Sequence, residues 1–162
     1  MKLGANPDET DRLGAVADDL EIRGLIARLA HLADDGELHD YIELFTADAV
    51  WGGGGQPLRE GREAILTGAR ERRDSGLAGP GAATRHVVTT TWIEITGDSA
   101  TGRSVFHFYT GLDDQPSLAV LGVYRDEFRR TPEGWRLAAR LLDGNADSQP
   151  PHDRSSAATP DR

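Results

Sequence analysis

The spacing of the large apolar residues changes once along the chain, near Thr84. Before Thr84 they recur every three or four positions, which is the period of an amphipathic helix, and after it they alternate, which is the period of a strand. Short turn sequences between long strands indicate antiparallel pairing. Helices that precede and stay separate from an antiparallel sheet are typical of the α+β class. The sequence therefore predicts an α+β fold.

The first helix is the clearest of the three that we expect before Thr84. Its apolar stripe consists of Ile22, Leu25, Ile26, Leu29, Leu32 and Ala33. Asp18 and Asp19 offer N-cap chemistry just before this stripe. Gly36 follows the last apolar position and is expected to end the helix.

Two further helices and one short strand are expected before the sheet proper. Crowded apolar residues over 38–45 predict a short second helix, and residues 62–73 predict a third with an arginine-rich solvent face. Ala-Val-Trp at 49–51 reads as a brief strand. The four glycines at 52–55 lack the Lys and Ser or Thr of a phosphate-binding loop, so we interpret them as a flexible loop.

The strands after Thr84 carry apolar residues on both faces. We expect them at about 84–96, 101–110, 117–130 and 134–142. With unbroken alternation, Val88 and Trp92 share one face of the first strand, and Val87, Ile93 and Ile95 share the other. Both faces must then be covered, so we expect the sheet to curl around a pocket, to meet a partner subunit, or both.

Composition limits the class of protein. The chain has 162 residues, a net charge of −9 and no cysteine, so we expect one domain, no disulfide and no thiolate metal site. An acidic chain is repelled by phosphate backbones, so nucleic acid is not an expected partner. No apolar run is long enough for a membrane span and the start is unlike a signal peptide, so we expect a cytoplasmic protein with no membrane partner.

Both ends differ from the middle of the chain in composition. Residues 1–16 lack a hydrophobic period, and residues 144–162 are rich in Pro, Ser, Ala and Asp. We therefore expect a flexible N-terminal segment over 1–16, a domain over 17–143, and a disordered tail over 144–162.

Two of the five histidines are candidates for chemistry. His152 lies in the expected tail, whereas His31 and His39 are expected to face solvent. His86 and His107 lie within strands among apolar neighbours, where a histidine is more often a hydrogen-bonded core residue than a catalyst. If both side chains converged on one pocket, they could move protons near neutral pH.

A carboxylate is the usual partner of a histidine base, because it orients the ring and stabilises the imidazolium. Asp34 and Asp35 end the first helix, where carboxylates oppose the helix dipole, which hints that one is retained for another purpose. We find no metal-ligand spacing such as His-Glu-x-x-His and no nucleophile elbow. These residues by themselves predict a pocket with a possible His–Asp pair, and no cofactor.

Several motifs together resemble a known family. The stretch over 25–50 runs from a helix ending in Asp34, through a Gly-acid pair, to a helix ending in Phe-Thr-x-Asp-Ala. It is followed by Thr-Arg-His at 84–86, Gly-Asp-Ser-Ala at 97–100, Tyr-Arg-Asp-Glu-Phe at 124–128 and Gly-Trp-Arg-Leu at 134–137, with Arg140 beyond. In order and spacing these motifs resemble SnoaL-like domains of the nuclear-transport-factor-2-like superfamily over about residues 18–142.

The resemblance implies a cone of curved antiparallel sheet closed by three helices, the cystatin-like α+β barrel, usually dimeric through the outer face of the sheet. The superfamily holds dehydratases, isomerases, polyketide cyclases, epoxide hydrolases, oxygenase small subunits and binding proteins without activity. The motifs are most similar to the scytalone dehydratase branch. There, Asp34 matches the aspartate that orients a base, His86 matches that base, and His107 stands near the second histidine. That branch has a tyrosine just before the aspartate, where this chain has Ala33, and a second tyrosine on the strand after the second helix, near which this chain has only Trp51. The resemblance implies that those tyrosines polarise the substrate carbonyl through water.

The sequence thus favours a cofactor-independent, dehydratase-like lyase or isomerase acting on a small apolar or polycyclic hydroxy-carbonyl substrate. His86 would be the general base, Asp34 its orienting partner and His107 an acid or hydrogen-bond donor. The candidate substrate-binding aromatics are Trp51, Trp92, Phe106 and Tyr109. The alternatives are a non-catalytic binding or assembly protein of the same fold, or a polyketide cyclase or epoxide hydrolase. We also expect a two-fold homodimer through the sheet; the alternative is a monomer whose outer face is made polar by arginines and threonines.

Overall fold

The computed structural model describes residues 7–144 of the chain. Its elements in chain order are α1 (Pro7–Asp35), α2 (Leu38–Glu43), β1 (Phe45–Gly53), β2 (Gln56–Glu60), α3 (Gly61–Asp74), β3 (Thr84–Thr96), β4 (Ser99–Thr110), β5 (Ser117–Thr131) and β6 (Gly134–Gly144). The α+β class is confirmed, and so are the ends of α1 and α3 and the four strands after Thr84, to within two residues.

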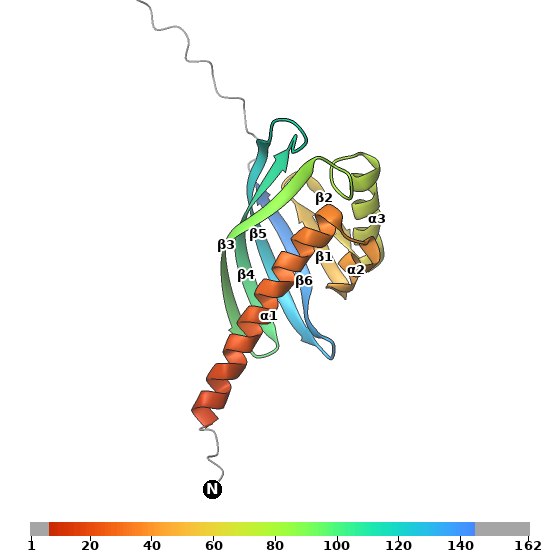
Figure 1. The fold of residues 1–162 in the computed structure, drawn as a ribbon. Coiled ribbons are helices and arrows are strands. Elements are labelled where there is room, and N and C mark those ends of the chain that lie inside the picture. Colours follow the sequence, from red (N-terminus) through yellow and green to blue (C-terminus); the bar gives the residue numbers. More distant parts are fainter. Residues whose placement is uncertain (1–6, 145–162) are drawn as a thin grey trace, which may run out of the picture.

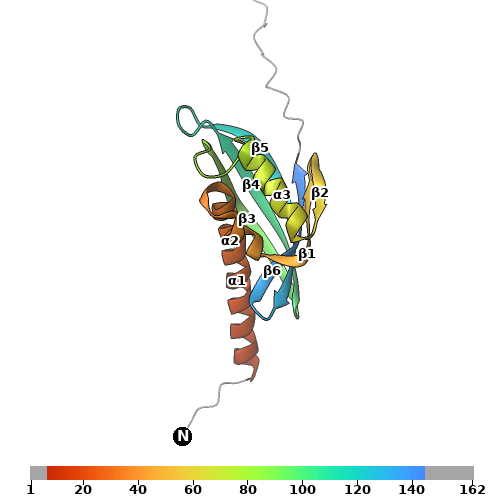
Figure 2. The same cartoon turned by 90° about the vertical axis from the view of Figure 1, so that its right-hand side faces the viewer.

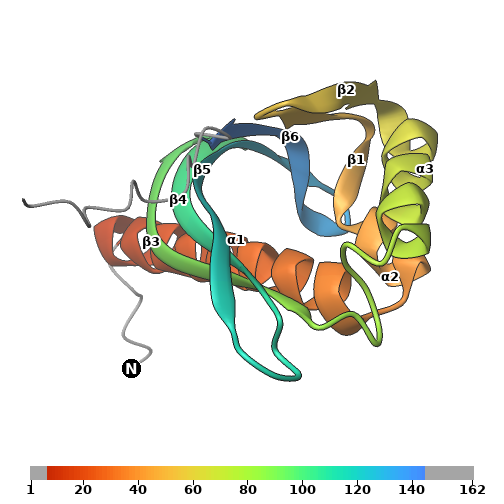
Figure 3. The same ribbon diagram turned by 90° about the horizontal axis from the view of Figure 1, so that it is seen from above.

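The six strands form one sheet in the order β2-β1-β6-β5-β4-β3. Strands β3 to β6 pair as the predicted antiparallel meander. Strand β1 joins β6 in parallel, so the sheet is mixed rather than fully antiparallel. The sheet bends strongly but does not close on itself, as Figure 3 shows from above.

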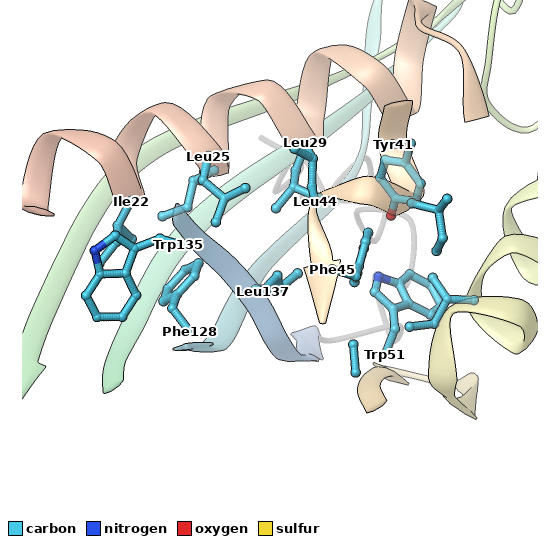
Figure 4. Packing of buried hydrophobic residues seen from close by; sticks show 14 of the residues in the cluster. Ile22, Leu25, Leu29, Tyr41, Leu44, Phe45, Trp51, Phe128, Trp135 and Leu137 are labelled. Carbon is cyan, nitrogen blue, oxygen red and sulfur yellow. The ribbon is translucent and has the colours of Figure 1, made fainter. Parts of the chain in front are cut away.

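The helices cover the inner face of the bent sheet. Helix α1 runs diagonally across it and packs on β3 and β6, whereas α3 packs on β1 (Figures 1 and 2). The buried side chains of the main core come from all three helices and from β1, β4, β5 and β6. Figure 4 shows Ile22, Leu25, Leu29, Tyr41, Leu44, Phe45, Trp51, Phe128, Trp135 and Leu137 among them.

Helix α1 begins at Pro7 rather than at Asp18 or Asp19 as predicted. The Asp18 carboxylate instead accepts hydrogen bonds from Arg130 Nη2 (2.6 Å) and Trp135 Nε1 (3.1 Å). The helix therefore includes residues 7–16 of the segment expected to be flexible, and its N-terminal end projects beyond the sheet (Figure 1). Residues 1–6 and nearly all of the tail expected over 144–162 lie outside the described residues.

The glycines at 52–55 form a β-hairpin turn rather than a flexible loop. Gly53 pairs with Gln56, which leaves Gly54 and Gly55 as the two turn residues, with φ of +60° and +84°. Both values are positive, as in a type I′ turn, which glycine adopts at little cost. Strand β2 begins at Gln56 and was not predicted from the sequence.

A β-bulge in β3 overturns the expected arrangement of its side chains. Val88 pairs with Phe106 and Thr91 with Ser104, so β3 holds one residue more than β4 between these two pairs. An extra residue reverses which face the following side chains occupy. Ile93 and Ile95 therefore share the inner face with Val88, and Trp92 lies on the outer face with 63% of its surface exposed.

We predict that Asp18→Asn lowers the free energy of unfolding at neutral pH but not at acidic pH. Hydrogen bonds from Arg130 and then Trp135 lower the pKa of Asp18 in the folded protein. Stability from a depressed carboxylate pKa is present above its unfolded value, near 4, and is lost as the pH falls through the folded value. Urea unfolding should show Asp18→Asn less stable by about 1 kcal/mol at pH 7, with the gap closing below pH 3. A constant gap across this range would contradict the assignment.

Candidate active site

Asp34 and His86 are joined by two hydrogen bonds at the inner face of the sheet. His86 Nδ1 lies 2.6 Å from Asp34 Oδ1, and the His86 backbone N–H donates to Asp34 Oδ2 at 2.9 Å. The Asp34 side chain is 2% exposed and that of His86 is 20% exposed. Because a carboxylate accepts hydrogen bonds, Nδ1 is the nitrogen that donates to Asp34, which leaves Nε2 as the other nitrogen of the ring, not bonded to Asp34.

His86 lines a cavity of about 330 Å³ between the bent sheet and helix α3. The aromatic and charged residues of its wall are Trp51, Arg72, His86, Phe106, Phe108 and Tyr124. A narrower extension of about 50 Å³ continues toward α1 and α2, where Ala33, Tyr41 and Arg140 line it. Most small-molecule sites are concave, largely apolar and marked by a few polar groups, as this one is.

Aromatic side chains line the cavity beside His86. Phe106 and Tyr124 stack with ring centroids 4.1 Å apart and an interplanar angle of 8°. Phe108 lies against His86 at a centroid distance of 4.6 Å. These rings form a cluster separate from the main core, together with partly buried Val88, Val120 and Leu142. The wall of the cavity beside His86 is therefore largely aromatic.

Arg140 and Asp126 form a buried ion pair at the inner end of the cavity. Arg140 Nε and Nη2 donate to the two Asp126 carboxylate oxygens at 2.8 and 2.7 Å. Burial alone would lower the pKa of Arg140, but the charge and hydrogen bonds of Asp126 outweigh it and raise that pKa. The guanidinium also lies 4.0 Å from the centroid of the Tyr124 ring. Burial raises the pKa of the Tyr124 phenol, so its hydroxyl stays protonated at neutral pH.

Two of the four candidate aromatics lie at the cavity and two do not. Trp51 and Phe106 line it, as predicted. Trp92 faces outward because of the bulge in β3. Tyr109 and His107 alternate with the inward Phe106 and Phe108 along β4, so they lie on the outer face, where their rings contact each other edge-on at 6.1 Å.

The expected convergence of His86 and His107 is therefore wrong. His86 pairs across the sheet with Phe108, whereas His107 pairs with Val87. Side chains of successive strand residues point to opposite faces, so His107 and His86 lie on opposite sides of the sheet. His107 therefore cannot act on a substrate that is bound beside His86, so the predicted role of acid or hydrogen-bond donor does not belong to it.

Five residues that line the cavity or pair with its lining were not expected there from the sequence: Tyr41, Arg72, Tyr124, Asp126 and Arg140. A signal for Asp126 was present, because alternation places it on the same face as Tyr124 and Phe128, and a carboxylate on an apolar face requires a buried partner. Arg72 had no such signal, since it belongs to an arginine-rich helix whose exposed and inward positions look alike in sequence.

Comparisons with known proteins show the family. Residues 14–141 match the sequence profile of the SnoaL-like domain, so the chain belongs to that family. No curated protein is detectably similar in sequence. The structure is similar to an NTF2-like protein with a cystatin-like fold from Novosphingobium aromaticivorans, with a TM-score of 0.79 and 28% identity over 89% of this chain and 93% of that one.

Two further solved structures share the fold. A protein of unknown function with a cystatin-like fold from Nostoc punctiforme is 23% identical with a TM-score of 0.71, over 91% of this chain and 97% of that one. A candidate dehydratase of the NTF2-like family from Streptomyces avermitilis is 19% identical with a TM-score of 0.66, over 79% of this chain and 96% of that one. At these identities the similarity shows the fold alone.

Two other features of residues 7–144 bear on the class of site. Among them, no three His, Cys, Asp or Glu side chains gather in a way that could hold a metal ion. None of the helices is both long and apolar enough to cross a membrane.

We predict that Asp126→Leu destabilises the fold by about 3–5 kcal/mol, because it leaves the buried Arg140 charge without a partner. Replacing both residues, as Asp126→Leu with Arg140→Met, removes the charge as well and should recover most of the loss. Urea unfolding monitored by circular dichroism measures both variants. Equal stability of the single and the double variant would contradict this account of the pair.

Proposed function

We propose that the protein is a cofactor-independent lyase or isomerase in which His86 removes a proton from carbon. The observation that carries the proposal is the buried Asp34 carboxylate, which holds both the ring and the backbone of His86 at the wall of an aromatic cavity. A carboxylate buried at a helix end is unfavourable unless it is bonded, and here its bonds orient a base. The substrate class is a small apolar or polycyclic hydroxy-carbonyl compound.

In this mechanism the neutral His86 ring accepts, at Nε2, a proton from the carbon next to the substrate carbonyl. The electrons of the broken C–H bond form an enolate, and the Asp34 carboxylate stabilises the resulting imidazolium. In a dehydration, the hydroxyl on the neighbouring carbon then leaves as water, taking a proton from His86. In an isomerisation, the same proton returns to another carbon. The protonated Tyr124 hydroxyl is suited to donate a hydrogen bond to the substrate.

We predict that His86→Ala lowers the rate of proton abstraction by about 10²- to 10⁴-fold. The assay measures deuterium uptake at C2 of 1-tetralone in D₂O by mass spectrometry, which reports proton abstraction before the natural substrate is known. Asp34→Asn should also reduce the rate, because an amide does not stabilise the imidazolium. His39→Ala is the matched control, since His39 is exposed on α2, away from the cavity wall. Equal exchange in wild type and His86→Ala would contradict the proposal.

The same experiment tests the alternative of a binding or assembly protein. Such a protein uses the cavity for a ligand without converting it. It would bind aromatic ligands, tolerate Asp34→Asn, and show no exchange above background in any variant.

The proposal includes a homodimer formed through the outer face of the sheet. The large apolar side chains exposed on this face are Val87, Trp92, Leu118, Leu121 and Leu141. They lie on β3, β5 and β6 of the same sheet face, where Arg103 and Arg125 stand between Trp92 and Leu141. Large apolar side chains exposed on one face often mark a protein–protein contact. A two-fold axis through the sheet would cover the patch with its own copy.

We predict a mass of twice 17.5 kDa in light scattering at micromolar concentration. Leu121→Asp should shift the mass to that of one chain, because it places a charge in the interface. Leu13→Asp is the matched control, since Leu13 is also exposed but lies on the projecting part of α1. A wild-type mass near 17.5 kDa would rule out the dimer.

A further inference from the structure

Arg72 differs from the other arginines that line the cavity. Arg140 is paired with Asp126, and Arg73 donates to the backbone carbonyls of Leu32 and Gly36. Within residues 7–144, no carboxylate lies within salt-bridge distance of Arg72. The neighbouring acid on the same helix, Glu71, is bound by Arg59.

The Arg72 guanidinium is nevertheless drawn into the cavity rather than released to solvent. It lies over the Trp51 ring at 4.3 Å from the centroid, and it lines both the main cavity and its narrow extension. Burial lowers the pKa of Arg72, which indicates that its charge is partly desolvated, although an arginine stays protonated at neutral pH. A cation taken out of water without an acid partner gains from any anion that enters.

The stacking of Arg72 leaves its donors in a defined direction. A guanidinium that lies over a ring uses its face for the cation–π contact, so its N–H groups remain free at its edge. That edge is a planar fork which matches the two oxygens of a carboxylate. The two buried acids that contact the lining of the cavity are already bonded, because Asp34 holds His86 and Asp126 holds Arg140.

We infer that Arg72 binds a carboxylate of the substrate and that the substrate is a planar aromatic or fused-ring acid. The rings of such a compound would lie in the aromatic part of the cavity, beside Phe106, Tyr124 and Trp51. Its carboxylate would pair with Arg72, and the reacting carbon would lie beside His86, which lines the same cavity. The chemical step rests on the proposed function, but the binding does not.

The test compares 2-naphthoate with the neutral 2-naphthamide, which has nearly the same shape, by isothermal titration calorimetry. Wild type should bind the acid at least about tenfold more tightly than the amide. Arg72→Met should lose this preference by weakening binding of the acid alone. Arg70→Met, an exposed arginine of the same helix, is the matched control and should keep the preference. Equal affinity in wild type, failure of both compounds to bind, or a preference that survives in Arg72→Met would overturn the inference.

A second measurement uses only the wild-type protein, in case Arg72→Met does not fold. Phenylglyoxal modifies accessible arginines, and mass spectrometry locates the modified residue. 2-Naphthoate should protect Arg72 and 2-naphthamide should not; equal protection, or none, would overturn the inference. Titrating His86→Ala with 2-naphthoate separates the two proposals, because binding through Arg72 should persist there even if His86 proves to have no part in proton abstraction.

Discussion

The inner face of a bent sheet must be covered, and α1 covers only part of it. Ile22, Leu25 and Leu29 pack on the sheet along the middle of the helix, where the core is dense. The helix ends at Asp35, and beyond it the aromatic cluster of Phe106, Phe108 and Tyr124 has no helix stripe packed on it. The cavity lies where this cover stops, so the length and direction of α1 decide its position.

The same end of α1 brings its last buried carboxylate to the first residues of β3. Asp34 therefore has two roles. It joins the helix to the sheet through the His86 backbone, and it orients the His86 ring at the cavity wall. Two hydrogen bonds, one to the backbone and one to the side chain of His86, restrict the ring more than either bond alone. The proposed base is thus positioned by a contact that also joins α1 to β3.

Charge in the cavity follows a single rule with one exception. Buried ions are expensive unless they are paired, and Asp126 with Arg140 and Asp34 with His86 obey this rule. Arg72 is partly desolvated and has only the Trp51 ring as a partner among the described residues. We interpret Arg72 as the residue that the ligand pairs with, since a cation without an acid partner at an aromatic wall is stabilised most by an incoming anion.

The sequence by itself determined the order of elements, the α+β class and the meander of β3 to β6, because periods of 3.6 and 2 are local properties of the chain. It also singled out Asp34 and His86, which stand at the ends of regular elements. Tertiary structure decided the rest. One extra residue in β3 turned Trp92 outward, the alternation of β4 separated His107 from His86, and packing of α3 on β1 turned Arg72 inward. Bulges, strand partners and the inward face of a polar helix depend on contacts between residues distant in sequence, and no local pattern contains them.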